Sequence, residues 1–99
     1  MERQDIIEAL KNNQTPTFTD INDVVFRLVK LAKVRDSTEF LITRQPPENF
    51  PPTEAAFEVS GQDLAVMQET PEEYMTKIFI NYVNAQGFGG TFDAEENVG

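Results

Sequence analysis

The chain has 99 residues, of which 39% are apolar and 25% are charged, and its formal net charge at pH 7 is −9. It contains neither cysteine nor histidine, which excludes disulfides, thiolate metal sites and the nucleophile–base pairs that depend on these side chains. A chain of this length forms one domain with one modest core, and its apolar content lies outside the composition typical of disordered proteins.

The charge is unevenly distributed along the chain. Residues 1–45 carry seven acidic and seven basic side chains, whereas residues 46–99 carry ten acidic side chains and a single base, Lys77. A field of one sign favours cationic protein surfaces and disfavours nucleic acid and anionic membranes. Because no apolar run approaches the roughly 20 residues of a membrane span, and residues 1–10 are too charged for a signal peptide, we expect a soluble, cytoplasmic protein.

The first predicted element is a short amphipathic helix over residues 2–12. Its apolar residues, Ile6, Ile7 and Leu10, recur at helical spacing, while acidic residues lead and a lysine comes near the end. Thr15-Pro16 then acts as a breaker, because proline disfavours the helical conformation of the residue before it.

Residues 19–35 fit two structures. As a helix, they place an apolar stripe from Ile21 to Ala32 on one side, with Thr19 or Asp20 as N-cap and cations at the end. As a strand, residues 24–29 alternate between two faces and are rich in valine. Capping and end charges agree with the helical period, so we favour the helix; in the strand alternative, Asp36-Ser37 is a hairpin turn.

The middle of the chain combines a predicted strand with a proline-rich connector. Residues 38–43 alternate as a strand does, and four prolines then fall within residues 46–52, which predicts a stiff, extended connector. A connector with Phe50 packed into the core is favoured over a recognition loop in which Phe50 is the anchor.

Residues 56–68 also have two interpretations. Gly61 suits the turn of a β-hairpin between residues 56–60 and 64–68, which we prefer. In the alternative, a short helix begins at Ser60, whose side chain caps the amide of Asp63.

The last helix, from Thr70 to Ala85, has the clearest signals. Thr70 as N-cap, Pro71 at the first helical position and Glu73 three residues after the cap form a capping box. An apolar face follows, and Gly87 is expected to end the helix in the left-handed conformation. Residues 87–99 lack apolar density, so we divide the chain into a globular domain, 1–86, and a flexible acidic tail, 87–99.

The sequence contains only fragments of known phosphate-binding, calcium-binding and catalytic motifs. The glycines at 87–90 lack the lysine and the flanking strand and helix of a phosphate loop. Asp20, Asn22 and Asp23 lack the glycine and distal glutamate of a calcium loop, so capping explains them better. Paired carboxylates for a glycosidase would need a cleft that a chain this short hardly offers. We therefore expect no enzyme activity and no catalytic, cofactor or metal site.

A local basic run, Arg27 to Arg35, is better explained by salt bridges and helix-end pairing than by contact with nucleic acid. Self-association through the apolar face of the last helix is a further possibility, which would make the chain a structural or assembly protein.

Together these observations predict an α+β fold with the N-terminal and C-terminal helices packed on a small, mostly antiparallel sheet. In size and acidity the chain is similar to the small inhibitors and accessory proteins of bacteriophages, although no motif carries this likeness. The predicted function is a non-enzymatic module that docks on a basic surface of a larger protein, with a DNA-mimicking inhibitor as the alternative. The residues expected at the contact are Arg44, Glu48, Phe50, Glu54, Glu58, Asp63, Glu69, Glu72 and Glu73.

Overall fold

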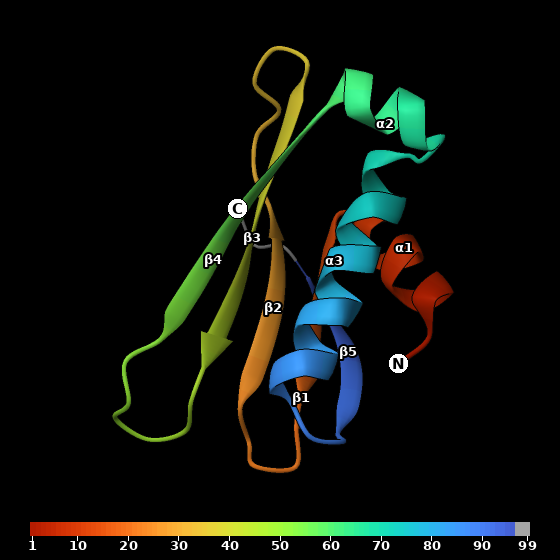
Figure 1. Ribbon diagram of the computed structural model, residues 1–99. Coiled ribbons are helices and arrows are strands. Elements are labelled where there is room, and N and C mark those ends of the chain that lie inside the picture. Colours follow the sequence, from red (N-terminus) through yellow and green to blue (C-terminus); the bar gives the residue numbers. More distant parts are fainter. Residues whose placement is uncertain (97–99) are drawn as a thin grey trace.

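The computed structural model describes residues 1–96 (Figure 1). In chain order its elements are α1 (Arg3–Lys11), β1 (Gln14–Thr19), β2 (Val25–Lys30), β3 (Ser37–Gln45), β4 (Thr53–Ser60), α2 (Gly61–Met67), α3 (Pro71–Gln86) and β5 (Thr91–Glu96).

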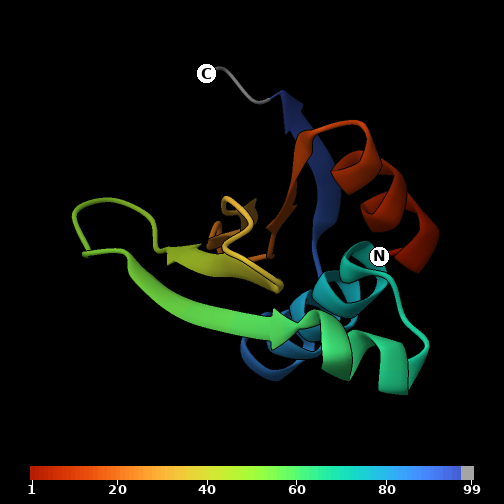
Figure 2. The same ribbon diagram turned by 90° about the horizontal axis from the view of Figure 1, so that it is seen from above.

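The fold is α+β, as predicted. The five strands form one antiparallel sheet in the order β4-β3-β2-β1-β5, so β4 and β5 are its edges. The helices lie together on one side of the sheet; β4 begins on the side of the molecule away from α1 and runs into α2 at its C-terminal end (Figures 1 and 2). None of the helices formed by residues 1–96 is long and apolar enough to cross a membrane.

The core lies between the helices and alternate residues of the strands. Phe26, Phe40 and Ile42 are fully buried on the helix side of the sheet, where they pack with Met75 and Phe79 of α3. Such burial of large apolar side chains supplies most of the driving force for folding. The apolar face of α3 contributes Met75, Phe79 and Val83 to this core, and Tyr74, Ile78, Ile80 and Tyr82 are partly buried against it.

The favoured helix over residues 19–35 is wrong, because the strand alternative is what forms. Phe26 and Leu28 enter the core while Val25 and Val29 face the other side of the sheet. Pairing with β3 and β1 on both sides outweighs the local capping signals, since tertiary packing routinely overrides helix propensity.

Asp20 caps a turn, not a helix. It is buried in the β1–β2 turn, where its Oδ1 accepts hydrogen bonds from the amides of Asn22 (2.8 Å) and Val24 (3.0 Å). These bonds to its own neighbouring backbone are typical of aspartate in turns. The hairpin turn between β2 and β3 lies one residue earlier than expected, between the bridged residues Val34 and Ser37.

The sequence interpretation missed β1 because Pro16 was taken only as a breaker. The Pro16 side chain is fully buried. Its backbone nitrogen points towards β2, as do the backbone groups of Phe18 and Asp20. The β1–β2 pairing ends at Thr17, whereas the β1–β5 pairing continues to Gln14. This asymmetry follows from the missing N–H of proline, which cannot donate to a ladder.

The preferred hairpin around Gly61 is also wrong. The alternative forms instead: α2 begins after Ser60, whose side chain accepts a hydrogen bond from the amide of Asp63 (3.1 Å). The backbone amide of Gly61 donates to Asp36 of the β2–β3 hairpin (2.7 Å). A β-carbon at Gly61 would meet the Asp36 carboxylate, which explains glycine here as a close-approach residue.

The capping box of α3 is confirmed in full. Thr70 Oγ1 accepts from the amide of Glu73 (3.1 Å), and the Glu73 carboxylate accepts from the amide of Thr70 (2.9 Å). The predicted left-handed stop at Gly87 is not found, because this residue is extended, with φ −105°. Phe26 Cε2 lies 3.2 Å from where a β-carbon at Gly87 would stand, so glycine allows close packing there.

Part of the segment expected to be a flexible tail forms β5. Thr91–Glu96 pairs with β1 over six residues, and Phe92 packs against the core. The low apolar density of this segment is offset by partners far away in the sequence, including Arg27, which binds Glu95. Residues 97–99 of the predicted tail lie outside the described residues.

Candidate interaction surface

One face of the sheet carries no helix. Alternate residues of every strand point to this side, away from the core, and we call it the open face. It consists of Thr15, Thr17, Thr19, Val25, Arg27, Val29, Glu39, Leu41, Thr43, Gln45, Glu54, Ala56, Glu58, Thr91, Asp93 and Glu95.

The open face is acidic, with five carboxylates and one guanidinium. The guanidinium belongs to Arg27, on the central strand, and its Nε lies 3.0 Å from Oε1 of Glu95. Thr17 Oγ1 donates to the same carboxylate oxygen (3.0 Å). Arg27 therefore forms its ion pair on the β5 side of the open face and forms none with the carboxylates on the β4 side.

Three glutamates form the uncompensated part of the open face. Glu39 lies on β3, and Glu54 and Glu58 lie on β4. None of them forms an ion pair with a cation of residues 1–96. We call these three residues the acidic strip.

Glu39 and Glu58 are directly opposite each other across β3 and β4. The amide of Leu31 donates to the carbonyl of Glu39 (2.9 Å), so the backbone groups of Glu39 point to β2 and not to β4. The Glu39–Glu58 pair is therefore of the non-hydrogen-bonded type, in which the Cα atoms lie about 4.5 Å apart and the side chains come closest. Two like charges at such a position repel each other.

The same alternation leaves backbone groups of β4 without a ladder partner. Because β3 bonds the odd-numbered residues of β4, the N–H and C=O groups of Glu54, Ala56 and Glu58 point outward. No further strand lies beyond β4 in the sheet formed by the described residues. Exposed edges of this kind are templates for strand pairing.

Two hollows lie beside β4. One, of about 270 Å³, is lined by Leu31, Glu39, Phe40, Ala56, Phe57 and Glu58. The other, of about 470 Å³, is lined by Arg27, Thr43, Gln45, Pro52, Thr53 and Glu54. The first hollow therefore combines an apolar lining with two members of the acidic strip, and the second contains one member together with Arg27.

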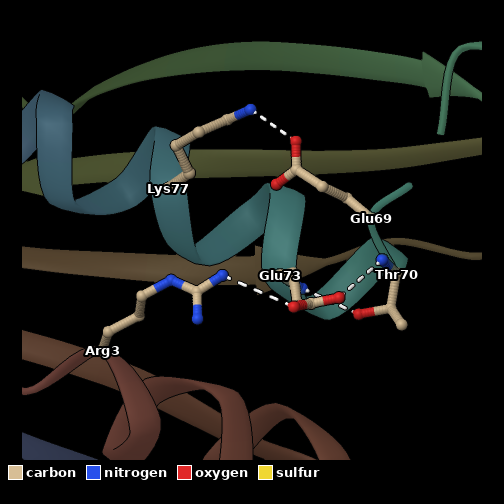
Figure 3. Close-up of polar contacts among 5 residues, drawn as sticks. All are labelled: Arg3, Glu69, Thr70, Glu73 and Lys77. Carbon is tan, nitrogen blue, oxygen red and sulfur yellow. Dashed lines mark hydrogen bonds and ion pairs between the residues drawn. The ribbon is translucent and has the colours of Figure 1, made fainter. Parts of the chain in front are cut away.

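Three of the predicted contact residues are engaged in ion pairs around the start of α3. Glu69 lies 2.7 Å from Lys77 Nζ and Glu73 lies 3.6 Å from Arg3 Nη2 (Figure 3). Glu72 lies 3.8 Å from Lys30 Nζ. The carboxylates of residues 46–99 therefore do not form one uncompensated surface, because cations from the first half of the chain are placed among them.

Hydrogen bonds and a nearby cation perturb the Glu73 carboxyl group. The hydrogen bond from the Thr70 amide, then the hydrogen bond from the Thr70 side chain and the proximity of Arg3, lower the pKa of the Glu73 carboxyl below its usual value. These contacts favour the ionised form. They give Glu73 a structural role in the N-terminal cap of α3 (Figure 3).

The remaining predicted residues lie at opposite ends of the molecule. Asp63 is in the first turn of α2, where its amide is capped by Ser60. Arg44 and Phe50 line a hollow of about 340 Å³ beside the 46–52 loop, at the other end of β4, and Glu48 lies in the same loop with a positive φ of 62°.

Phe50 is not part of the core. Its side chain is 65% exposed, contrary to the favoured connector interpretation. The loop is fixed by Gln45, whose Nε2 donates to the carbonyls of Pro46 (3.0 Å) and Phe50 (3.4 Å). The backbone of Phe50 is thus held in place while its ring faces outward.

The basic run of residues 27–35 does not share one face. Arg27 lies on the open face, Lys30 pairs with Glu72 on the helix side, and Lys33 and Arg35 lie at the β2–β3 hairpin. Among residues 1–96, no group of three or more acidic side chains is arranged to hold a metal ion.

Sequence reasoning brought Glu54 and Glu58 to the candidate surface but missed Glu39 and the backbone edge of β4. Glu39 precedes the charge boundary at residue 46, so a division by sequence position excluded it. Its alternation with Phe40 in a predicted strand was the available signal, since it places Glu39 on the side of the sheet away from the core.

Comparison with protein-family models, with curated proteins and with solved structures finds no match to this chain.

Proposed function

We propose that this chain is a small, non-enzymatic interaction module that docks on a basic surface of a larger protein through the β4 side of its open face. The observation that carries the proposal is the acidic strip, Glu39, Glu54 and Glu58, which has no cation partner among residues 1–96. A cationic surface would supply the missing counter-charges and relieve the repulsion between Glu39 and Glu58.

The surrounding side chains support docking as well. Leu41 on β3 and Ala56 on β4 are directly opposite each other, and Ala56 lies between Glu54 and Glu58 along its strand. Val29 on β2 lies opposite Leu41 and extends this line of apolar side chains across the open face. Apolar groups surrounded by polar and charged ones are typical of protein interfaces. Glu48 and Phe50 lie in the loop before β4, where they extend the same contact in this proposal. Arg44 lies opposite Thr53 at the start of β4, but by alternation with Ile42 it is on the helix side of the sheet and is left out of the contact.

The proposal is tested with two variants of equal net charge. In the first, Glu39, Glu54 and Glu58 are replaced by glutamine; in the second, Glu2, Asp5 and Glu8 of the exposed side of the N-terminal region are replaced by glutamine or asparagine. Both variants and the wild type are used to capture proteins from a host lysate at low salt, and each captured protein is then purified and titrated with all three at increasing salt.

Docking through the acidic strip predicts weakened binding only for the first variant, together with a steep loss of wild-type affinity as salt increases. Equal weakening of both variants would show a non-specific charge effect, and no weakening would refute the docking surface. Addition of duplex DNA identifies a DNA-mimicking inhibitor, because such an inhibitor would compete with the duplex for the same cleft.

A further inference from the structure

We propose that β4 accepts an extended, lysine-bearing segment of the partner as a sixth strand of the sheet. This inference rests on the proposed function and specifies its binding mode. Glu54, Ala56 and Glu58 direct their backbone N–H and C=O groups away from β3, and no described strand pairs with them. An added strand satisfies these groups by main-chain hydrogen bonds.

Access to this edge is open. Thr53, Glu54, Ala56 and Glu58 are exposed, and β4 runs along the margin of the molecule away from α1 and α3 (Figure 1). The strand is eight residues long and pairs with β3 over its whole length without a bulge. A regular edge of this length, without a bulge, can serve as a template for strand addition.

The charges of β4 favour basic residues at particular positions of an added strand. Glu54 and Glu58 are four residues apart on the open face, so an added strand places two residues, also four apart, directly opposite them. Lysine or arginine at these two positions forms opposite-charge cross-strand pairs. The residue between them lies opposite Ala56, which favours a small or β-branched apolar side chain.

The hollow beside Glu58 fits a lysine in particular. Its lining includes Leu31 and Ala56 as apolar residues together with Glu39 and Glu58. A lysine side chain can lay its methylene stem on such an apolar surface while its ammonium group reaches the acids. The repulsive glutamate pair then becomes a two-carboxylate acceptor for one cation.

The same charges oppose pairing of β4 with a second copy of itself. Two copies could pair all three outward-facing residues by placing their β4 strands antiparallel, with Ala56 opposite Ala56. In that register, Glu54 of each copy lies directly opposite Glu58 of the other. Like charges directly opposite each other destabilise a sheet. The edge is therefore protected from self-association while it remains open to a basic strand, which is a known use of edge charges.

The test uses a synthetic, terminally blocked peptide with the sequence Ser-Lys-Thr-Val-Thr-Lys-Ser-Thr and three controls. One control peptide has both lysines replaced by glutamate, and another carries N-methyl groups on the two lysines and the valine, whose amides would face β4. The third control is the Ala56→Pro variant, which removes an outward N–H without removing a bond to β3. Binding is measured by calorimetry and by amide hydrogen exchange.

Strand addition predicts that the unmodified peptide binds and slows exchange at the amides of Glu54, Ala56 and Glu58. N-methylation of the peptide or Ala56→Pro should weaken binding about tenfold or more, since each removes hydrogen bonds worth roughly 1 kcal/mol apiece. The glutamate peptide should not bind. The hydrogen-exchange measurement is made on the wild type. It therefore shows whether the peptide pairs with β4 even if the proline variant is unstable.

The two proposals fail in different ways. If the peptide binds and the triple glutamine variant does not bind it, but N-methylation has no effect and the three amides still exchange fast, docking stands and strand addition is refuted. If the triple glutamine variant binds the peptide as well as the wild type does, the acidic strip is not the docking surface. Absence of any binding by the unmodified peptide also refutes strand addition of a basic segment.

Discussion

Glu39 and Glu58 face each other across β3 and β4 at a position where cross-strand side chains come closest, and neither has a cation partner among the described residues. An arrangement of this kind costs stability in the free protein. A cation placed between the two carboxylates would remove this repulsion.

This relationship predicts that Glu58→Lys stabilises the free protein. The substitution replaces a repulsive cross-strand pair with an attractive one, for which we expect a gain of about 0.5 kcal/mol in the free energy of unfolding. Glu54→Lys is the matched control, because Glu54 lies opposite the neutral Thr43. Urea denaturation of both variants checks the prediction. An equal gain in both would point to reduced net charge instead of the pair.

A second prediction concerns Thr76, in the middle of α3. Its side chain is fully buried, and among the described residues its hydroxyl has no hydrogen-bond partner. Thr76→Val keeps the shape and removes the unsatisfied group, so the free energy of unfolding should rise by about 1 kcal/mol. Thr17→Val should show no such gain, because Thr17 Oγ1 donates to Glu95. Destabilisation by Thr76→Val would contradict this reading of the core.

A third prediction concerns the exchange of the β5 amides. In the register with β1, the backbone groups of Asp93 and Glu95 point to β1, while those of Phe92 and Ala94 point outward. Hydrogen exchange followed by NMR should therefore be slow at the first two amides and fast at the other two. Uniformly fast exchange across residues 91–96 would support the flexible tail expected from the sequence.

The two aromatic residues Phe40 and Phe50 should respond very differently to truncation. Phe40 is fully buried and stacks on Phe57 at 5.2 Å, so Phe40→Ala should cost about 3–5 kcal/mol of stability. Phe50→Ala should change stability by no more than about 0.5 kcal/mol, because the ring is largely exposed. Thermal or urea unfolding measures both, and a large loss in Phe50→Ala would place this ring in the core.

Glu73 gives a prediction about acid stability. Its folded-state pKa is lowered by the Thr70 hydrogen bonds and by Arg3, so its stabilising contribution is fully present above the ordinary glutamate pKa and is lost as the pH falls through the lowered value. Glu73→Gln cannot titrate. The difference in unfolding free energy between the wild type and this variant should be constant at neutral pH and shrink below about pH 4. A difference independent of pH would contradict the assignment.

Elements with strong local signals were predicted from the sequence. The first helix and α3 carry their own apolar period and end signals, and the capping box of Thr70 and Glu73 forms as expected because all its partners lie within four residues. The strand around Phe40 was found for the same reason, since its alternation is a local property.

Elements that depend on distant partners were not predicted. Residues 19–35 have the capping residues and end charges of a helix. Residues 25–30 nevertheless form the middle strand of the sheet, because β1 and β3 lie on both sides of them. Pro16 marks the end of α1 in the sequence, but in the fold it lies inside a strand whose other partner, β5, is nearly 80 residues further along the chain.

The candidate surface shows the same division. The sequence alone determined the net charge, the absence of histidine and cysteine, the first and last helices, and the N-terminal capping box of the last one, because these follow from composition or from contacts between near neighbours. Only the tertiary structure decided which carboxylates lie together. Strand register brought Glu39 beside Glu58, and helix packing brought Arg3 and Lys30 to the acids of α3, since electrostatic compensation depends on distances in space and not on separation along the chain.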